Sequence, residues 1–143
     1  MNGSETPKHH NLKMELAELL ESWGHNAEAI DGYTKKSPRK VENTNKVGDG
    51  EDKIPDIDGF NPGERQYLRG EAKIGDGDIE SLHSITQYML FSDLYNKENR
   101  KNSLLFIIVP ASCKNELNDV LIRHVPRRNW ENIRMIQSSR YSD

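Results

Sequence analysis

Ile54-Pro55-Asp56-Ile57-Asp58-Gly59 predicts the first of two short strands, and Gly70-Glu71-Ala72-Lys73 predicts the end of the second. Successive side chains in a strand point to opposite faces. Glu71 and Lys73 are therefore expected on one face, with small and apolar neighbours on the other. The intervening Asn61-Pro62-Gly63-Glu64 is typical of a turn. The pattern thus predicts a hairpin that brings an aspartate beside Glu71 and Lys73.

Pro55-Asp56 followed by Glu71-Ala72-Lys73 resembles the motif of the PD-(D/E)XK nuclease superfamily, which includes type II restriction enzymes and archaeal Holliday junction resolvases. The likeness is strict over residues 54–73 and looser from residue 12 to residue 87. It implies an α/β chain with the three-layer α/β/α restriction endonuclease-like fold, a central mixed sheet and the element order α-β-β-β-α-β-α-β. It also implies a Mg²⁺-dependent DNA endonuclease that hydrolyses phosphodiester bonds.

The resemblance gives roles to individual residues. Asp56 and Glu71 would bind the metal through their carboxylates, and the backbone carbonyl of Ala72 would be a third ligand. Oxygen ligands suit Mg²⁺, for which Mn²⁺ would substitute. Lys73 would orient or activate the attacking water. Gln87 matches the glutamine that completes the site in resolvase-like members, on the helix after the Glu-X-Lys strand.

Two assignments stay open. Asp58 shares the predicted strand face of Asp56 and is the reserve ligand, although aspartate before glycine is also typical of turns. Resolvase-like nucleases present a glutamate from the first helix, but Lys13 stands at that place in this chain. Glu15, at the border of the apolar stripe, could substitute for it. His9 and His10 could join the start of this helix, although neighbouring histidines near a terminus are commonly mobile.

Apolar spacing predicts the other elements. Helices are expected at about residues 11–23 and 78–96, each with an apolar stripe at helical spacing. The unbroken apolar run at residues 104–109 predicts a strand that is covered on both faces. Ser112 is a candidate cap for a third helix, and residues 132–137 are expected to form a last strand.

Length and composition indicate one domain over residues 1–143. Hydrophobic residues make up 34% of the chain and the mean hydropathy is −0.88, so the core must be small. Residues 33–53 are rich in charged and small polar residues and are expected to form a flexible loop. Its basic part, Lys35 to Lys40, could contact a phosphate backbone.

The charge balance gives no overall basic field, since 20 basic and 23 acidic residues leave a net charge of −3. DNA is nevertheless the expected partner, because bound metal neutralises acidic groups and local basic patches set the phosphate contacts. The resemblance to junction resolvases implies a homodimer, and an additional subunit could recognise the DNA. The alternative function is a noncatalytic nucleic-acid-binding or assembly module on the same fold, as the missing glutamate of the first helix would suggest.

Cys113 is the only cysteine, which excludes an intrachain disulfide and a cysteine zinc cluster. No apolar run reaches the roughly 18 residues that a membrane span needs, and the N-terminus has no hydrophobic region of a signal peptide. We therefore expect a reducing, cytoplasmic setting without a membrane partner.

Overall fold

The structure is a computed structural model that describes residues 5–143. No helix in this part of the chain has both the length and the apolar character needed to cross a membrane. The helices are α1 (Pro7–Ser22), α2 (Leu82–Phe91), α3 (Lys114–His124) and the short 3-10 helices η1 (Ala111–Cys113) and η2 (Arg127–Asn132). The strands are β1 (Asn26–Ile30), β2 (Ile57–Asn61), β3 (Gln66–Ala72), β4 (Tyr95–Asn96), β5 (Lys101–Asn102), β6 (Leu104–Val109) and β7 (Ile133–Gln137).

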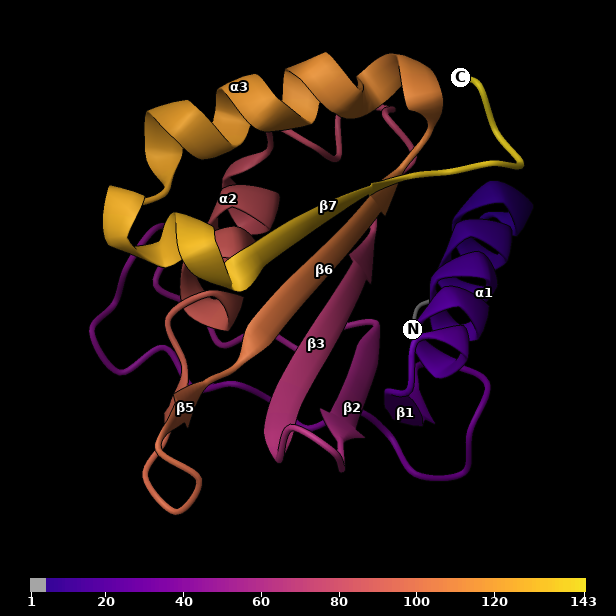
Figure 1. Ribbon diagram of the computed structural model, residues 1–143. Coiled ribbons are helices and arrows are strands. Elements are labelled where there is room, and N and C mark those ends of the chain that lie inside the picture. Colours follow the sequence, from indigo (N-terminus) through magenta and orange to yellow (C-terminus); the bar gives the residue numbers. More distant parts are fainter. Residues whose placement is uncertain (1–4) are drawn as a thin grey trace.

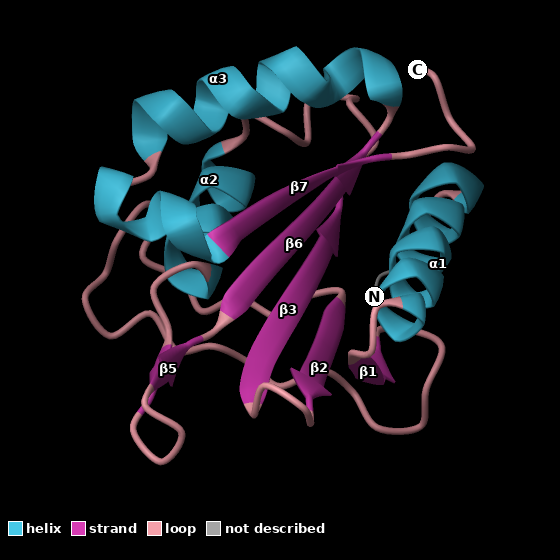
Figure 2. Ribbon diagram, in the orientation of Figure 1, coloured by secondary structure: helices cyan, strands magenta, loops and turns pink. Residues whose placement is uncertain are grey.

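Five strands form a mixed sheet in the order β1-β2-β3-β6-β7 (Figure 1). The pairs β1–β2 and β2–β3 are antiparallel, whereas β3–β6 and β6–β7 are parallel. The connection from β3 to β6 contains α2, and the connection from β6 to β7 contains α3, as parallel neighbours require. A separate two-stranded ribbon, β4–β5, lies in the first of these connections (Figure 2).

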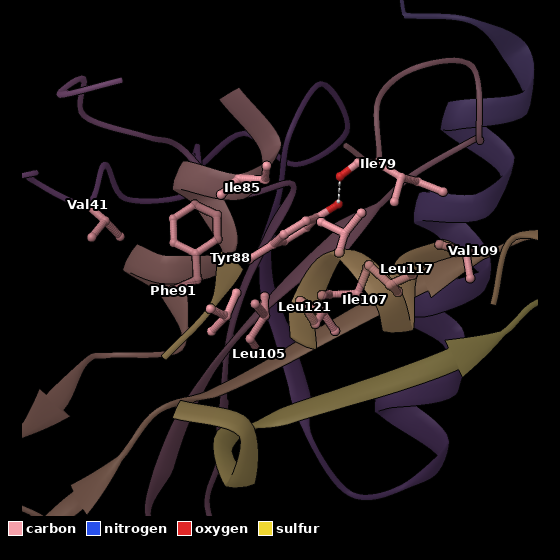
Figure 3. Close-up of a cluster of buried hydrophobic side chains, with 12 residues drawn as sticks. Val41, Ile79, Ile85, Tyr88, Phe91, Leu105, Ile107, Val109, Leu117 and Leu121 are labelled. Carbon is pink, nitrogen blue, oxygen red and sulfur yellow. Dashed lines mark hydrogen bonds between the residues drawn. The ribbon is translucent and has the colours of Figure 1, made fainter. Parts of the chain in front are cut away.

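Strand β6 alternates between two apolar clusters, one on each face of the sheet. Leu105, Ile107 and Val109 pack with residues of α2 and α3, as the close-up in Figure 3 shows. Phe106 and Ile108 pack with residues of α1 on the other face. Helices therefore cover both faces of the sheet, and the prediction of a strand without a polar face is confirmed.

The α/β class and the mixed central sheet are as the sequence predicts, but two helices have other bounds than expected. Helix α1 begins at Pro7, because the side chain of Thr6 accepts a hydrogen bond from the His9 amide and proline suits the first helical position. Helix α2 begins only at Leu82, after Ser81 caps the amide of Ser84. The chain leaves α2 after Phe91 and turns into β4.

The long connection between β1 and β2 contains no helix or strand, apart from a single bridge between Val41 and Lys53. It is fastened to α2, since the Asp49 amide donates to Thr86 Oγ1 at 3.0 Å. The buried Lys53 ammonium lies 2.6 Å from Asp49 and 2.7 Å from Nδ1 of His83. These contacts hold the second half of the connection against the helix that carries Gln87.

Candidate active site

The β2–β3 hairpin brings Asp56 and Glu71 together. Ile57 pairs with Gly70 across the two strands, so the residues just beyond this pair lie side by side. The Asp56 amide donates a hydrogen bond of 2.7 Å to Glu71 Oε2, across 15 positions of sequence. Glu71 is only 1% exposed. The Glu71 carboxylate thus lies against the backbone of Asp56 at the end of β3.

Lys73 and Gln87 complete this cluster from two further elements. The Lys73 ammonium lies 3.4 Å from Glu71 Oε1 and donates to Gln87 Oε1 at 2.6 Å. It also lies 5.9 Å from the centre of the Tyr88 ring, next to Gln87 on α2. Both Lys73 and Gln87 are buried. The structure therefore brings together all four side chains that the sequence singles out.

The main chain of Ala72 also faces Asp56. The Ala72 amide donates to Asp56 Oδ2 at 2.9 Å, and the N–H and C=O of one strand residue point to the same neighbouring strand. Because Ile57 pairs with Gly70, the residue that would face Ala72 is Pro55. Proline has no N–H to offer to the Ala72 carbonyl. Across from Ala72, the segment before β2 therefore offers no backbone N–H to this carbonyl.

Burial and neighbouring charges shift the pKa values of the two carboxyl groups in opposite directions. Burial and the neighbouring Asp56 charge raise the pKa of Glu71 to about 8, against the opposing effect of Lys73. Burial also acts to raise the pKa of Asp56, but the hydrogen bond and charge of His9, the Ala72 amide and Lys73 outweigh it and lower that pKa. Of the two groups, Glu71 therefore binds a proton more readily. A cation between the carboxylates would take the place of that proton.

His9 is the functional candidate that the sequence interpretation missed. Its Nε2–H donates to Asp56 Oδ2 at 3.2 Å and its Nδ1–H to Glu5 Oε2 at 2.5 Å. Burial alone would lower the pKa of His9, but the two carboxylates raise it to about 9, so the ring is an imidazolium. The missed signal was the cap at Thr6, which extends α1 and places His9 in its first turn.

Lys13 does not replace the missing glutamate of the first helix. Its buried ammonium donates to Glu5 Oε2 at 2.6 Å and to the Asp31 carbonyl at 2.5 Å. Glu5 therefore joins Lys13 to His9, and through His9 to Asp56. Helix α1 thus contributes a positively charged ring to the cluster.

Asp58 and Glu15, the two alternative ligands, contact groups outside this cluster. Asp58 accepts from Arg39 Nε at 2.7 Å and from Arg39 Nη2 at 3.2 Å. Glu15 is 3% exposed and accepts from the Ser138 hydroxyl at 2.7 Å and the Ser139 amide at 2.9 Å. Glu15 therefore fastens the segment after β7 to α1, and both carboxylates already have partners of their own.

The oxygen donors of this cluster suit a small hard cation. Within residues 5–143, no group of three or more His, Cys, Asp or Glu side chains could hold a metal ion. The candidate set is smaller: two carboxylates, Asp56 and Glu71, and the Ala72 carbonyl. Mg²⁺ is commonly held by one or two carboxylates, with water and substrate phosphate oxygens in the other positions. The set fits that pattern and does not fit a closed, all-protein metal cage.

Comparisons of the chain with protein-family models, with curated proteins and with solved structures found no match.

Proposed function

We propose that this protein is a Mg²⁺-dependent DNA endonuclease of the PD-(D/E)XK type, with a restriction endonuclease-like fold. The observation that carries the proposal is the contact between the Asp56 amide and Glu71 Oε2, at 2.7 Å. It places the Glu71 carboxylate against the backbone of Asp56 and beside Lys73, in the order and spacing of the superfamily motif. The helices on both faces of a mixed sheet support the proposed fold.

In this proposal Asp56, Glu71 and the Ala72 carbonyl would hold Mg²⁺, which would neutralise negative charge on the phosphate and lower the pKa of a water. The Lys73 ammonium lies beside Glu71 and is positioned to orient the attacking water or to stabilise charge on the phosphate. Gln87 fixes the ammonium by accepting its hydrogen bond. Burial of the cluster excludes bulk water and strengthens these interactions.

One observation favours the noncatalytic alternative. Asp56 Oδ2 already accepts hydrogen bonds from the Ala72 amide and from His9. A metal at Asp56 must share this carboxylate with two donors, and the positive His9 ring opposes a nearby cation. A nucleic-acid-binding or assembly module that has lost catalysis would keep this arrangement without metal.

The test is cleavage of labelled single-stranded, duplex, flapped and four-way-junction DNA in Mg²⁺, Mn²⁺ or EDTA. We compare the wild type with Glu71→Gln and Lys73→Met. Matched controls are Glu64→Gln and Lys97→Met, which change the same residue types at exposed positions. We expect cutting only with metal, and a loss of about 10²-fold or more in the two site variants.

Cutting that survives in Glu71→Gln would exclude Glu71 as an essential ligand and assign the activity to another centre. Binding of every DNA without cutting of any would favour the noncatalytic module. A preference for the four-way junction would favour a resolvase, and a preference for another DNA would favour another nuclease role.

A further inference from the structure

A polar pocket lies along β3 from the proposed active site, on the same face of the sheet. Its volume is about 170 Å³. We call it the Arg39–Arg69 pocket; its lining residues are Arg39, Tyr67, Arg69, Leu94, Tyr95, Asn96 and Ser103. Arg69 and Glu71 are two positions apart on β3, so their side chains leave the same face about 7 Å apart along the strand.

Arg69 is the residue of this pocket whose hydrogen bonds are incomplete. It is only 9% exposed, and its Nη1 donates to the Ser103 hydroxyl at 3.0 Å. Its Nε is buried and has no hydrogen-bond partner among the residues that the structure describes. The nearest carboxylate oxygen, Asp58 Oδ1, is 3.7 Å away. A buried guanidinium with an unmade hydrogen bond is costly unless a ligand completes it.

Asp58 cannot neutralise both arginines. Arg39 takes both of its carboxylate oxygens through Nε and Nη2, and stacks its guanidinium 5.2 Å from the centre of the Tyr67 ring. Glu28 also acts on Arg39. Asp58, however, is the carboxylate that acts on Arg69, and Arg39 already occupies it. The positive charge of Arg69 is therefore incompletely neutralised. A planar guanidinium group donates two parallel hydrogen bonds to the oxygens of one phosphate, and arginine is therefore the preferred residue for binding phosphate.

We propose that the Arg39–Arg69 pocket binds a backbone phosphate of the nucleic acid, within about two nucleotides of the phosphate that is cut. The inference rests on the proposed nuclease function and extends it to the way the strand is held. The bound phosphate would accept hydrogen bonds from the remaining Arg69 donors and from one edge of Arg39. The side chains of Arg69, Glu71 and Lys73 would then lie along one strand of the nucleic acid. Burial lowers the pKa of Arg69, and an anion in the pocket would offset that cost.

The test is DNA binding in EDTA, where cleavage cannot contribute. We measure the affinity for a labelled duplex and its single strands across a salt series, for wild type, Arg39→Gln and Arg69→Gln. The matched control is Arg134→Gln, because Arg134 pairs with Phe106 and so lies on the opposite face of the sheet. We expect each pocket variant to lose about 5- to 10-fold in affinity and about one unit of salt slope, and the control to lose neither.

A second readout covers the case in which Arg69→Gln does not fold. The ¹⁵N resonance of Arg69 Nε is followed in the wild type during titration with a 5′-phosphorylated thymidine dinucleotide. We expect it to shift, and that of Arg134 to stay in place. An unchanged Arg69 resonance, together with an unchanged salt slope in Arg39→Gln, would overturn the proposal. Absence of metal-dependent cutting would instead contradict the proposed nuclease and leave the binding result standing.

Discussion

The Lys73 ammonium donates to Gln87 Oε1 at 2.6 Å, and both groups are buried. This contact ties the end of β3 to α2 and aims the ammonium at Glu71. Because the contact is buried, each partner depends on the other more than an exposed pair would.

Gln87→Leu should therefore remove the acceptor and leave a buried ammonium with an unmade hydrogen bond. We expect a loss of about 1–3 kcal/mol in the free energy of unfolding and a loss of about 10- to 100-fold in cleavage rate. Gln137→Leu, at an exposed position of β7, is the control. Denaturant unfolding and single-turnover kinetics measure the two effects.

The double variant Lys73→Met, Gln87→Leu gives the sharper result. If the hydrogen bond carries the effect, the pair of substitutions should be less destabilising than the sum of the single ones, since no buried charge is left alone. Simple additivity would contradict the assigned contact.

The stability of the metal-free protein should fall as pH rises from 6 to 9. Glu71, with its pKa raised to about 8, stabilises the folded state while protonated, and this contribution is lost from its ordinary pKa of 4.5 up to about 8. His9, with its pKa raised to about 9, contributes fully below 6.5 and loses its contribution towards 9. We expect Tm to drop by at least about 5 °C over this range.

Glu71→Gln should reduce the fall in Tm over this range and leave the part due to His9, because glutamine does not titrate. Mg²⁺ should raise Tm more at pH 8.5 than at pH 6, since metal binding displaces the Glu71 proton. A Tm that is constant or rises between pH 6 and 9 would refute this account of the carboxyl pair.

The sequence predicts the parts of the site that depend on local pattern. Alternation along residues 66–73 places Glu71 and Lys73 on one face. Gln87 follows from the resemblance and not from the predicted apolar stripe, since Leu82 of that stripe is 56% exposed. It does not predict His9, since the cap that starts α1 at Pro7 lies before the apolar stripe. Nor does it predict the partner of Glu15, because Ser138 is 123 positions away and no periodicity connects them. Contacts between residues so far apart in the sequence depend on how the helices and strands pack together.

His9→Ala should raise the pKa of Asp56. Burial favours the protonated form of Asp56, and the hydrogen bond and charge of His9 are the largest effects that oppose it by lowering the pKa. The carboxyl ¹³C resonance of Asp56, identified by its loss in Asp56→Asn, measures this pKa without metal. His10→Ala is the control, since His10 contacts Glu5 at 3.3 Å and is more exposed than His9. Identical Asp56 titrations in the wild type and His9→Ala would show that the His9 contact does not set this pKa.

Glu15→Gln separates a structural glutamate from a metal ligand. Glu15 accepts hydrogen bonds from the Ser138 hydroxyl, the Ser139 amide and the Ser139 hydroxyl, and a glutamine NH₂ group would face at least one of these donors. We expect a loss of about 1–3 kcal/mol in the free energy of unfolding, with no change in the Mg²⁺ concentration for half-maximal cleavage. Glu18→Gln, on the exposed side of α1, is the control. A Mg²⁺ requirement raised tenfold with unchanged stability would instead make Glu15 the helix-one ligand.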